Sequence, residues 1–405
     1  MSVSTDPSAI ANLLSRGVEN VYPSREYLEA RLREGKQLTL YCGYDPTAPT
    51  LHIGHGITLL KLRQFQDLGH KIIMLIGDFT GMIGDPTDKS ATRKRLTHDE
   101  AIANCKRYQD QVASILRFDG DNAAEMRFNN DWLGKMSFAD VVELAAHFTV
   151  QQMMERDMFE RRFEEGKPIY LHEFLYPLMQ GYDTVAMDVD GEVGGNDQTF
   201  NMLAGRTLMK EMKGKEKFVL TSKLLVAADG KKMGKSEGNM ISLEDSAEDM
   251  FGKVMRWEDG MIDLGYELCT RVSLEEIAAM RDARAAGTNP RDHKLRLAFE
   301  VTRTFLGDKA AEDGRAYFSQ VIQQRQTPDD MPVIEIREPE MNIVDLLVRA
   351  GLTESKSEAR RVVEEGGVTV EQQTVRDITT IVKIGTGVTI QKGKRHFTRV
   401  MPRND

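Results

Sequence analysis

Residues 38–76, LTLYCGYDPTAPTLHIGHGITLLKLRQFQDLGHKIIMLI, decide the fold class. The first five residues of this stretch are β-rich, and a turn that is rich in Gly and Pro follows them. Apolar residues then recur at three-residue steps, which predicts an amphipathic helix over 52–68. The short apolar run at 71–76 suits a buried parallel strand. Strand, helix and strand in this order indicate a βαβ unit and therefore an α/β fold with a parallel sheet.

The rest of the chain contains further elements and one linker. Residues 184–189 and 217–220 are further candidate strands, and 138–165 is helical by pattern and rich in Met and Phe. Residues 273–322 are mostly helical, with a break at the Gly and Pro of 287–290. Three of the twelve prolines fall within 326–340, which predicts an extended linker before a compact last segment.

The composition of the 405-residue chain is that of a soluble globular protein with two or three domains, since 40% of its residues are hydrophobic and 29% are charged. The chain holds no run of about 18 apolar residues, so no membrane span is expected. Its N-terminus lacks the pattern of a secretory signal. Three distant cysteines argue against a disulfide framework or a zinc site, and they predict a reducing, cytoplasmic environment.

The charge is unevenly distributed along the chain. The net charge is −9, which argues against a basic coat over the whole protein. Residues 341–405, however, carry 11 basic and 8 acidic side chains. A mildly basic end on an acidic body predicts local contact with a polyanion.

The turn and helix start at 41–55, YCGYDPTAPTLHIGH, have the features of a phosphate cradle. A helix N-terminus offers unpaired N–H groups and a partial positive charge. His52 and His55 lie on one face of its first turn, and Gly54 lets a ligand approach the backbone. The alternative interpretation is a histidine cap with surface histidines.

A second segment, 229–239, reads DGKKMGKSEGN and predicts a flexible cationic loop. Its three lysines, Lys231, Lys232 and Lys235, stand among three glycines. Mobile lysines can stabilise the charge that builds on a triphosphate in its transition state. The alternative for this segment is a solvated basic turn.

Together, HIGH at 52–55 and KMGKS at 232–236 resemble the signature pair of class I aminoacyl-tRNA synthetases. The resemblance implies a Rossmann-like catalytic domain that activates an amino acid as its adenylate. The second signature is usually written KMSKS, and here Gly234 replaces its first serine while both lysines remain.

The segment 170–198 points to the amino acid. Tyr176, Gln180 and Asp183 are spaced four and three residues apart, so a helix places all three on one side as a polar pocket wall. This stretch closely resembles the tyrosine-binding helix of bacterial tyrosyl-tRNA synthetases. The resemblance implies that Asp183 accepts the substrate phenol hydroxyl and that Tyr176 and Gln180 contact the α-amino group. It also implies that Gly195, Asp197 and Gln198 hold the ribose and the substrate.

The same resemblance assigns the other candidate site residues. Thr80 and Asp85 hold the substrate ammonium, and Asn129 and Tyr41 line the tyrosine pocket. The phosphate chemistry falls to His52, His55, Thr47, Lys89, Arg93, Lys232 and Lys235. The remaining residues of the ATP site are Cys42, Gly43, Asp45, Gly54, Thr58, Met233 and Ser236. Contacts to tRNA phosphates are expected from Lys356, Arg360 and Arg361, which lie near one face of a helix over 356–365.

The resemblance also implies the domain organisation. Residues 1–240 form the Rossmann-like catalytic domain, with a dimer-forming helical insertion at about 100–165. Residues 241–325 form a helical domain for the anticodon end, 326–340 the linker, and 341–405 a small α+β RNA-binding domain of the S-four type.

The expected activity is tyrosine–tRNA ligation with tyrosine, ATP accompanied by Mg²⁺, and tRNA(Tyr) as substrates, by a homodimer without a metal site of its own. Two alternatives stay open. One is another nucleotidyltransferase or a tryptophan-specific relative on the same domain. The other is a protein that keeps the fold only to bind structured RNA. The polar stripe and the terminal RNA-binding domain disfavour the first alternative, and the intact signature histidines and lysines disfavour the second.

Overall fold

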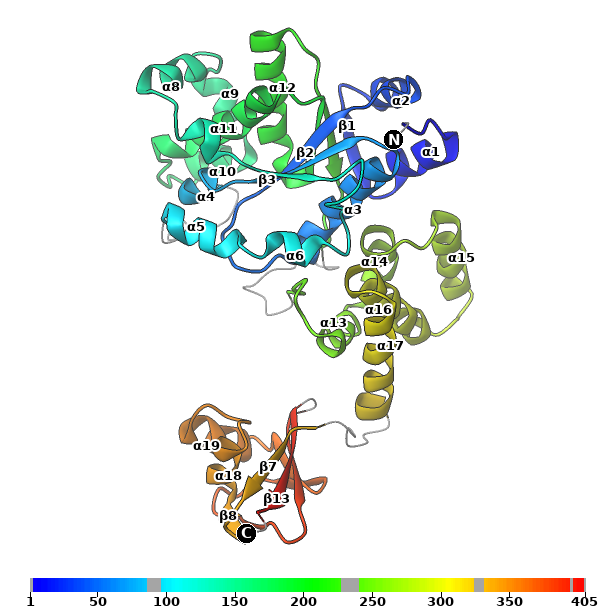
Figure 1. Ribbon diagram of the computed structural model, residues 1–405, viewed down its shortest axis with the longest axis vertical. Helices are drawn as coiled ribbons and strands as arrows, with labels where there is room; N and C mark the ends of the chain where they lie inside the picture. The colour runs from blue at the N-terminus through cyan, green and yellow to red at the C-terminus, as the bar shows by residue number, and fades with distance from the viewer. Residues whose placement is uncertain (1–2, 86–95, 227–239, 324–330, 394–395, 404–405) are drawn as a thin grey trace. The chain divides into compact units, whose positions relative to one another are not determined.

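The computed structural model describes residues 3–85, 96–226, 240–323, 331–393 and 396–403. The chain divides into two compact units, Met1–Ala311 and Glu312–Asp405 (Figure 1). Within the described ranges, no helix combines the length and the apolar character that crossing a membrane requires.

A six-stranded sheet forms the centre of the first unit. The strand order is β1-β6-β5-β2-β3-β4, and every neighbouring pair is parallel except β1 with β6. The strands are β1 (Val18–Tyr22), β2 (Thr39–Tyr44), β3 (Lys71–Ile76), β4 (Glu125–Phe128), β5 (Gly191–Gly195) and β6 (Phe218–Ser222). The predicted parallel sheet is therefore confirmed, and β1 adds an antiparallel edge that the sequence did not predict.

The predicted βαβ unit is β2, α3 and β3. Helix α3 (Ile53–Asp67) begins directly after His52, which caps it, and β3 has the predicted bounds 71–76. Five of the six β3 residues are buried, as expected for a central strand that is covered on both faces. The apolar residues that predicted α3, Leu59, Leu62 and Phe65, are completely buried.

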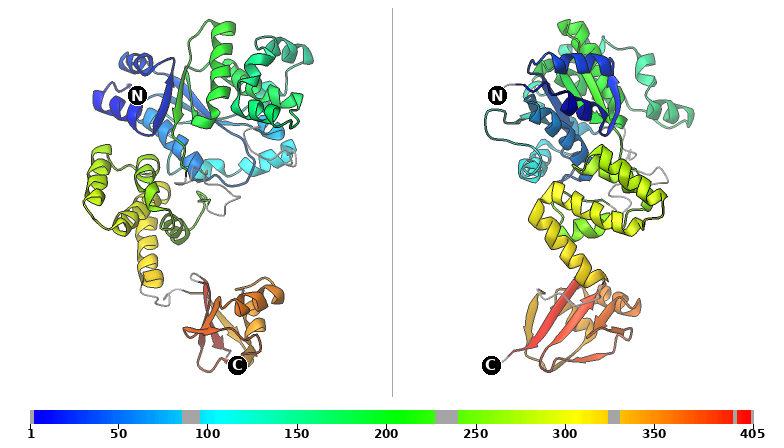
Figure 2. Two further views of the ribbon diagram at one scale, coloured as in Figure 1. Left: turned by 180° about the vertical axis from the view of Figure 1, so that it is seen from behind. Right: turned by 90° about the vertical axis from the view of Figure 1, so that its right-hand side faces the viewer.

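The side chains of β2 alternate between the two faces of the sheet, and their partners show which helix covers each face. The phenol of Tyr41 is hydrogen-bonded to Thr184 of α11 (Leu171–Met187), whereas the phenol of Tyr44 is hydrogen-bonded to Thr58 of α3. Residues an odd number apart on a strand point to opposite faces. Helix α3 therefore covers one face and α11 the other, with α12 (Thr199–Lys213) beside α11 (Figures 1 and 2). A Cβ atom on Gly181 would lie only 2.9 Å from Leu208, so glycine allows α11 and α12 to approach closely.

The strand predicted at 184–189 is wrong. Helix α11 continues to Met187, because Val185 packs with Leu178 and with Leu208 of α12 in one buried cluster. The helix ends at Asp188, which adopts a left-handed conformation with φ of 50°. The strand β5 begins only at Gly191. Tertiary packing thus overrides the β-propensity of the Thr-Val pair.

The helical predictions agree with the structure. The segment 138–165 forms three short helices, and 273–322 forms a series of helices with its break between Ala285 and Pro290. The helices of the first unit not yet given are α1 (Pro7–Ser15), α2 (Arg25–Arg33), α4 (Thr80–Ile83), α5 (His98–Cys105), α6 (Tyr108–Val112), α7 (Asn130–Leu133), α8 (Phe138–Ala145), α9 (Val150–Met154), α10 (Asp157–Glu164), α13 (Ala247–Val254), α14 (Ile262–Cys269), α15 (Leu274–Ala285), α16 (Pro290–Leu306) and α17 (Asp308–Tyr317), which continues into the second unit.

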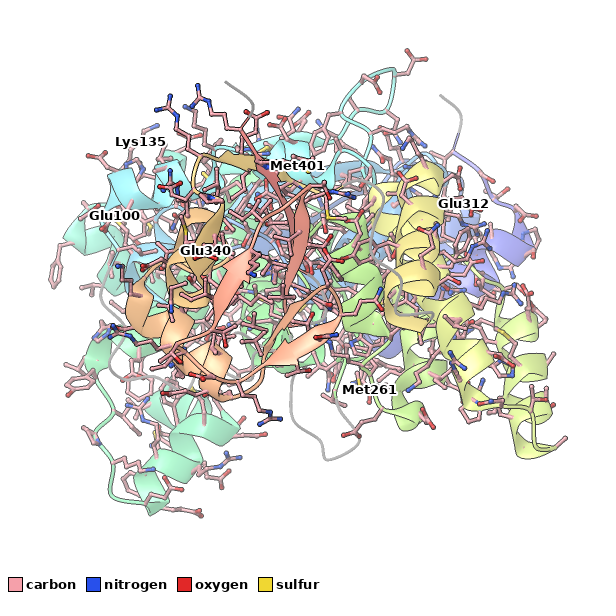
Figure 3. All side chains as sticks on the ribbon, turned by 90° about the horizontal axis from the view of Figure 1, so that it is seen from below. Glu100, Lys135, Met261, Glu312, Glu340 and Met401 are labelled. Atoms are coloured by element: carbon pink, nitrogen blue, oxygen red, sulfur yellow. The ribbon has the colours of Figure 1, made fainter. Side chains whose placement is uncertain are left out.

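The second unit has its own α+β core. A five-stranded sheet runs in the order β10-β9-β12-β13-β7, and β11 pairs with β8. Its elements are β7 (Val333–Ile336), β8 (Glu340–Asn342), α18 (Ile343–Arg349), α19 (Lys356–Glu364), β9 (Val368–Val370), β10 (Gln373–Val375), β11 (Ile381–Lys383), β12 (Val388–Lys392) and β13 (His396–Pro402). Leu346, Val363 and Ile390 are among the fully buried residues of this core. Glu340 on β8 and Met401 on β13 mark the two sheets in Figure 3.

The predicted linker lies within this second unit, and part of it forms a strand. Val333–Ile336 forms β7, which pairs in parallel with β13. Pro332 and Pro339 flank the strand rather than interrupt it, and prolines are tolerated at such positions. The extended conformation predicted from the prolines is therefore present at 333–336, but as a paired strand, and residues 326–330 lie outside the described ranges.

Candidate active site

The two histidines of the HIGH motif cap α3. The Nδ1 atom of His52 accepts a hydrogen bond from Gly54 N at 3.1 Å, and Nδ1 of His55 accepts one from His52 N at 3.1 Å. The two rings stack with their centroids 3.8 Å apart. A neutral imidazole that accepts at Nδ1 carries its proton on Nε2. Each ring is therefore a donor at its other nitrogen, which is the polarity that a phosphate oxygen needs.

Asp45 joins the turn after β2 to the residues predicted to bind tyrosine. Its Oδ1 atom accepts from Thr80 Oγ1 at 2.7 Å, and its Oδ2 atom accepts from the Tyr176 hydroxyl at 2.8 Å. Only glycine fits at position 77, because a Cβ atom there would lie 2.0 Å from Asp45 Oδ1. Asp45 was predicted as an ATP residue, and the structure places it between Thr80 and Tyr176.

Asp183 is the most deeply buried carboxylate among the predicted site residues, with 2% of its surface exposed. Its oxygens accept hydrogen bonds from Trp132 Nε1 at 2.7 Å and from Asn129 Nδ2 at 3.2 Å. Asn129 also donates to Thr80 Oγ1 at 3.0 Å. Burial raises the pKa of Asp183 well above its ordinary value, against the opposing effect of the two donors. Trp132, which follows Asn129 by three residues, was not predicted as a site residue.

Asp85 forms a second cluster with Gln198. Gln198 Nε2 donates to Asp85 Oδ2 at 2.8 Å, and Arg156 Nη2 donates to Asp85 Oδ1 at 2.7 Å. Asn201 donates to Gln198 Oε1 at 2.9 Å. The structure thus brings together Asp85 and Gln198, which were both predicted to bind the substrate. It adds Arg156, which is 5% exposed and precedes α10, as a cation that sequence reasoning missed.

Behind Tyr41 and Gln180 lies a buried charge pair that the sequence analysis did not single out. The Lys217 ammonium forms an ion pair with Glu192, and their side chains are 0% and 2% exposed. Gln180 Nε2 donates to Glu192 Oε1 at 3.0 Å, and Tyr41 contacts Thr184. The available signal was Lys217 at the start of the predicted strand 217–220, where a buried charge is expensive unless it is paired.

The described nucleotide residues lie in two places, around the end of β2 and the start of α3, and at the end of β5, where Gly195 and Asp197 are found. Thr58 Oγ1 is hydrogen-bonded to the Tyr44 hydroxyl at 3.0 Å, and a Cβ atom on Gly195 would lie 2.6 Å from Asp197 Oδ1. Cys42 is buried, and burial raises its pKa to about 12, so its thiol is not a nucleophile. The predicted residues outside the described ranges are Lys89, Arg93, Lys232, Met233, Lys235 and Ser236.

The predicted tRNA-binding residues are exposed on α19. This helix buries Ala359 and Val363 and turns Lys356, Arg360 and Arg361 to solvent. Lys356 forms a surface ion pair with Asp345, with 2.7 Å between Nζ and Oδ1. Such exposed pairs contribute little and are readily exchanged.

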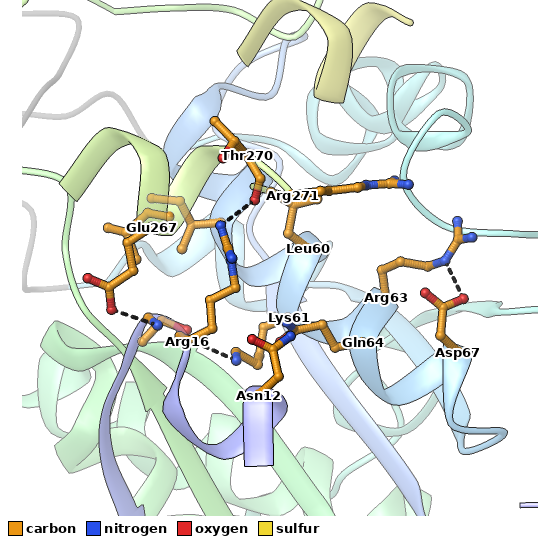
Figure 4. A pocket seen from close by; sticks show the side chains of 14 residues that line it. Asn12, Arg16, Leu60, Lys61, Arg63, Gln64, Asp67, Glu267, Thr270 and Arg271 are labelled. Carbon is orange, nitrogen blue, oxygen red and sulfur yellow. Dashed lines mark hydrogen bonds and ion pairs between the residues drawn. The ribbon is translucent and has the colours of Figure 1, made fainter. Parts of the chain in front are cut away.

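A cavity of about 190 Å³ lies apart from these clusters, between α1, α3 and α14 (Figure 4). The buried cations of this cavity, Arg16 and Lys61, donate hydrogen bonds to backbone carbonyls. The Arg16 guanidinium donates to the carbonyls of Tyr266, Thr270 and Val272, and Lys61 Nζ donates to those of Leu13 and Arg16. Burial and the nearby Arg16 charge lower the pKa of Lys61 to about 7. These side chains satisfy carbonyls at helix ends, so they brace the helices.

Comparison with known proteins shows the family of this chain. Residues 33–322 match the family described as tRNA synthetases class I (W and Y), and residues 322–400 match the tyrosine–tRNA ligase SYY-like C-terminal domain. The tyrosine–tRNA ligase of Moorella thermoacetica is 46% identical over 394 residues, which are 96% of this chain and 94% of that protein. The corresponding protein of Thermotoga maritima is 44% identical over 396 residues, 97% of this chain and 98% of its own length.

A solved structure shares the fold. A C-terminally truncated mitochondrial tyrosyl-tRNA synthetase from Coccidioides posadasii superposes with a TM-score of 0.63 at 26% identity. The match covers 76% of this chain and 91% of that one. With its two matched domains and its identity to relatives over nearly their whole length, this chain belongs to the tyrosine–tRNA ligases within the class I tRNA synthetases for tryptophan and tyrosine.

Proposed function

We propose that this chain activates tyrosine with ATP and transfers the tyrosyl group to tRNA(Tyr), using the clusters around Asp183, Asp85 and the HIGH motif. The observation that carries the proposal is the setting of Asp183. It is a buried carboxylate that two side-chain donors orient on a polar helix face. A carboxylate is an acceptor for a phenol hydroxyl, and phenylalanine brings no donor for the acceptor positions of Asp183 that Asn129 and Trp132 leave open.

The amino acid's ammonium is the second recognised group. Thr80, Asp85, Tyr176, Gln180 and Gln198 are our candidates for holding it, and Asp45 links two of them through its hydrogen bonds with Thr80 and Tyr176. Carboxylate oxygens supply the counter-charge that a desolvated ammonium requires. With the phenol held at Asp183 and the ammonium at these residues, the substrate carboxylate is the group left to react.

In the first step an oxygen of the tyrosine carboxylate attacks the α-phosphorus of MgATP. A new O–P bond forms, the bond to the β-phosphate oxygen breaks, and pyrophosphate leaves. His52 and His55 are donors at the start of α3, and they are assigned to the phosphates together with Thr47. Lys89, Arg93, Lys232 and Lys235 are assigned to the same chemistry from the sequence. No protein nucleophile takes part, because positioning and charge stabilisation do the work.

In the second step a ribose hydroxyl of the terminal adenosine of tRNA attacks the carbonyl carbon of tyrosyl-adenylate, and AMP leaves. The last unit is assigned to tRNA, with Lys356, Arg360 and Arg361 exposed on α19 as phosphate contacts. A cytoplasmic location is part of the proposal and is supported by three cysteines that are all free and buried.

The two-step scheme is tested by trapping its intermediate. Incubation with labelled tyrosine and MgATP, without tRNA, should give tyrosyl-adenylate that stays with the protein through gel filtration. Addition of tRNA(Tyr) should then move the label to the tRNA. Phenylalanine serves as the control amino acid and should leave no label on the protein. The absence of a protein-bound adenylate, or an adenylate that tRNA does not discharge, would contradict the proposal.

The assembly we propose is a homodimer formed through the segment α8–α11. Of the ten large hydrophobic side chains that are exposed in the described ranges, six lie between residues 138 and 171. Phe138 and Val142 share one face of α8 and are 84% and 53% exposed. Phe163 on α10 is 71% exposed. A concentration of apolar surface in one segment is typical of a protein–protein interface.

Charged substitutions in this segment should therefore produce monomers. Sedimentation velocity should give the wild type the mass of two 45.7 kDa chains and the double variant Phe138→Glu/Val142→Glu the mass of one. Ile381→Glu, at an exposed apolar residue of the second unit, is the matched control and should stay dimeric. A monomeric wild type, or a double variant that remains a dimer, would overturn the assignment of this interface.

A further inference from the structure

The ion pair between Lys217 and Glu192 has no role in the reaction as proposed so far, although it lies directly behind the phenol of Tyr41. Both side chains are completely buried, on the face of the sheet that α11 covers. Lys217 Nζ also lies 5.7 Å from the centroid of the Tyr41 ring. A buried pair of this kind contributes little to stability compared with apolar residues of the same size. Its position suggests a role in recognition.

The hydrogen bonds of Lys217 are fully determined. An ammonium carries three donors and no acceptor. Three acceptors surround it, namely the Glu192 carboxylate, Thr184 Oγ1 at 2.8 Å and the Met202 carbonyl at 3.3 Å. Thr184 Oγ1 therefore accepts from Lys217.

The second hydrogen bond of the Thr184 hydroxyl has a fixed direction. Its own proton needs an acceptor, and the Tyr41 hydroxyl oxygen lies 2.9 Å away. Of the two hydrogen-bonded neighbours of Thr184 Oγ1, only Tyr41 is able to accept. Tyr41 is consequently an acceptor toward Thr184, and its own proton points elsewhere. Burial raises the pKa of Tyr41 well above its ordinary value, so this proton stays on the phenol.

We propose that Lys217, acting through Thr184, fixes Tyr41 as a hydrogen-bond donor toward the substrate phenol, opposite the acceptor Asp183. Two other acceptors lie near the Tyr41 hydroxyl. The Gln180 carbonyl is 3.5 Å away and at the limit of a hydrogen bond, and both oxygens of the Glu192 carboxylate already accept from Gln180 and Lys217. The phenolic oxygen of a bound tyrosine is therefore a better acceptor for the Tyr41 proton than these groups are. This inference rests on the proposed function, and it makes Lys217 and Thr184 positioning residues for amino-acid selection.

With Tyr41 fixed as a donor and Asp183 as an acceptor, the site selects a group that both donates and accepts a hydrogen bond, in addition to selecting for size and polarity. A hydroxyl donates one proton and accepts another. The amino group of 4-aminophenylalanine donates well but accepts poorly, so it satisfies Asp183 and leaves the Tyr41 donor without a good partner. The site as built should reject this analogue, and it should do so less when the Tyr41 proton is able to turn away.

The test compares kcat/KM for tyrosine and for 4-aminophenylalanine in pyrophosphate exchange. Thr184→Val removes the bridging hydroxyl at nearly constant volume and should reduce the preference for tyrosine over the analogue by about tenfold. Thr184→Ser keeps the hydroxyl and should retain the wild-type preference. The double variant Glu192→Gln/Lys217→Met removes the charge pair together and should lose the preference as Thr184→Val does. Adding Thr184→Val to this double variant should change the ratio little, because the lysine acts through the threonine.

Thr302→Val is the matched control, since Thr302 is a buried threonine of α16 that donates to the Ala298 carbonyl at 2.8 Å. It should leave the ratio unchanged. A loss of kcat/KM that is equal for both amino acids in Thr184→Val and in the charge-pair variant would show a merely structural role and overturn the inference. A wild type without tyrosine-dependent exchange would instead refute the proposed function itself.

Discussion

Replacing Asp183 by alanine should lower kcat/KM for tyrosine in pyrophosphate exchange by about 30- to 900-fold, which corresponds to roughly 2–4 kcal/mol. The carboxylate is 2% exposed and is oriented by Asn129 and Trp132, so its removal takes the acceptor away from both of these donors and from the substrate phenol. The KM for ATP should change little, because no described nucleotide residue is hydrogen-bonded to Asp183. The preference for tyrosine over phenylalanine should fall by a similar factor.

The matched control is Asp188→Ala, which removes an exposed carboxylate just beyond the same helix. It should leave both kinetic constants close to those of the wild type. A variant Asp183→Ala that still selects tyrosine over phenylalanine as the wild type does would contradict the placement of the phenol.

The raised pKa of Asp183 leads us to expect that both the stability of the fold and the preference for tyrosine depend on pH. Burial raises the pKa of Asp183 in the folded protein, so the folded state binds this proton more tightly than the unfolded state. Its contribution to stability is therefore present at low pH and is lost as the pH rises from the ordinary carboxyl pKa through the raised one. Tyrosine selection has the opposite requirement, because it uses the ionised form. On acidification, the preference for tyrosine should fall at a pH above the ordinary carboxyl range, and Asp183→Asn should lack this transition.

Ending the chain after residue 330 should leave adenylate formation within about twofold of the full-length rate and reduce tRNA charging about 100-fold or more. The two units have separate cores, and the buried cluster of the second unit lies entirely between residues 336 and 400. Pyrophosphate exchange and aminoacylation should be measured on the same two proteins. The truncated protein should also show a shallower dependence of tRNA affinity on salt, because fewer phosphates are neutralised.

Point substitutions in the last unit test the same contacts without removing the unit. The triple variant Lys356→Ala/Arg360→Ala/Arg361→Ala should weaken tRNA binding and reduce the salt slope by about one for each phosphate that is no longer neutralised. Arg33→Ala/Lys36→Ala, two exposed basic residues in the first unit, is the control and should leave the slope unchanged. Equal loss of exchange and charging on truncation would mean that the last unit supports the catalytic fold instead of binding tRNA.

Much of the fold was predictable because local patterns and tertiary structure agree. The apolar run at 71–76 is β3 with unchanged bounds, and the three-step pattern at 59–68 is the buried face of α3. The strand expected at 184–189 was wrong because α11 gains more from packing against α12 than its Thr-Val pair gains from a strand. β1 was not predicted because its burial is partial, and its position depends on antiparallel pairing with β6, which is distant in sequence.

Helical spacing predicted that Tyr176 and Asp183 share one face, and the family resemblance assigned Asn129 and Thr80. The structure joins these four side chains through hydrogen bonds in which Asp45 links Thr80 to Tyr176. Lys217 and Glu192 could not be paired from the sequence, because 25 residues separate them and only the parallel pairing of β5 with β6 brings them together. Arg156 was missed for a related reason, since 71 residues separate it from Asp85.

The most direct test of the central claim is ATP–pyrophosphate exchange measured on the wild-type protein with each of the twenty amino acids in turn. The site described here predicts rapid exchange with tyrosine, and exchange with phenylalanine and tryptophan near the background rate. Exchange that is fastest with tryptophan, or equally fast with tyrosine and phenylalanine, would contradict the assignment of Asp183 and Tyr41 as the residues that recognise the phenol hydroxyl.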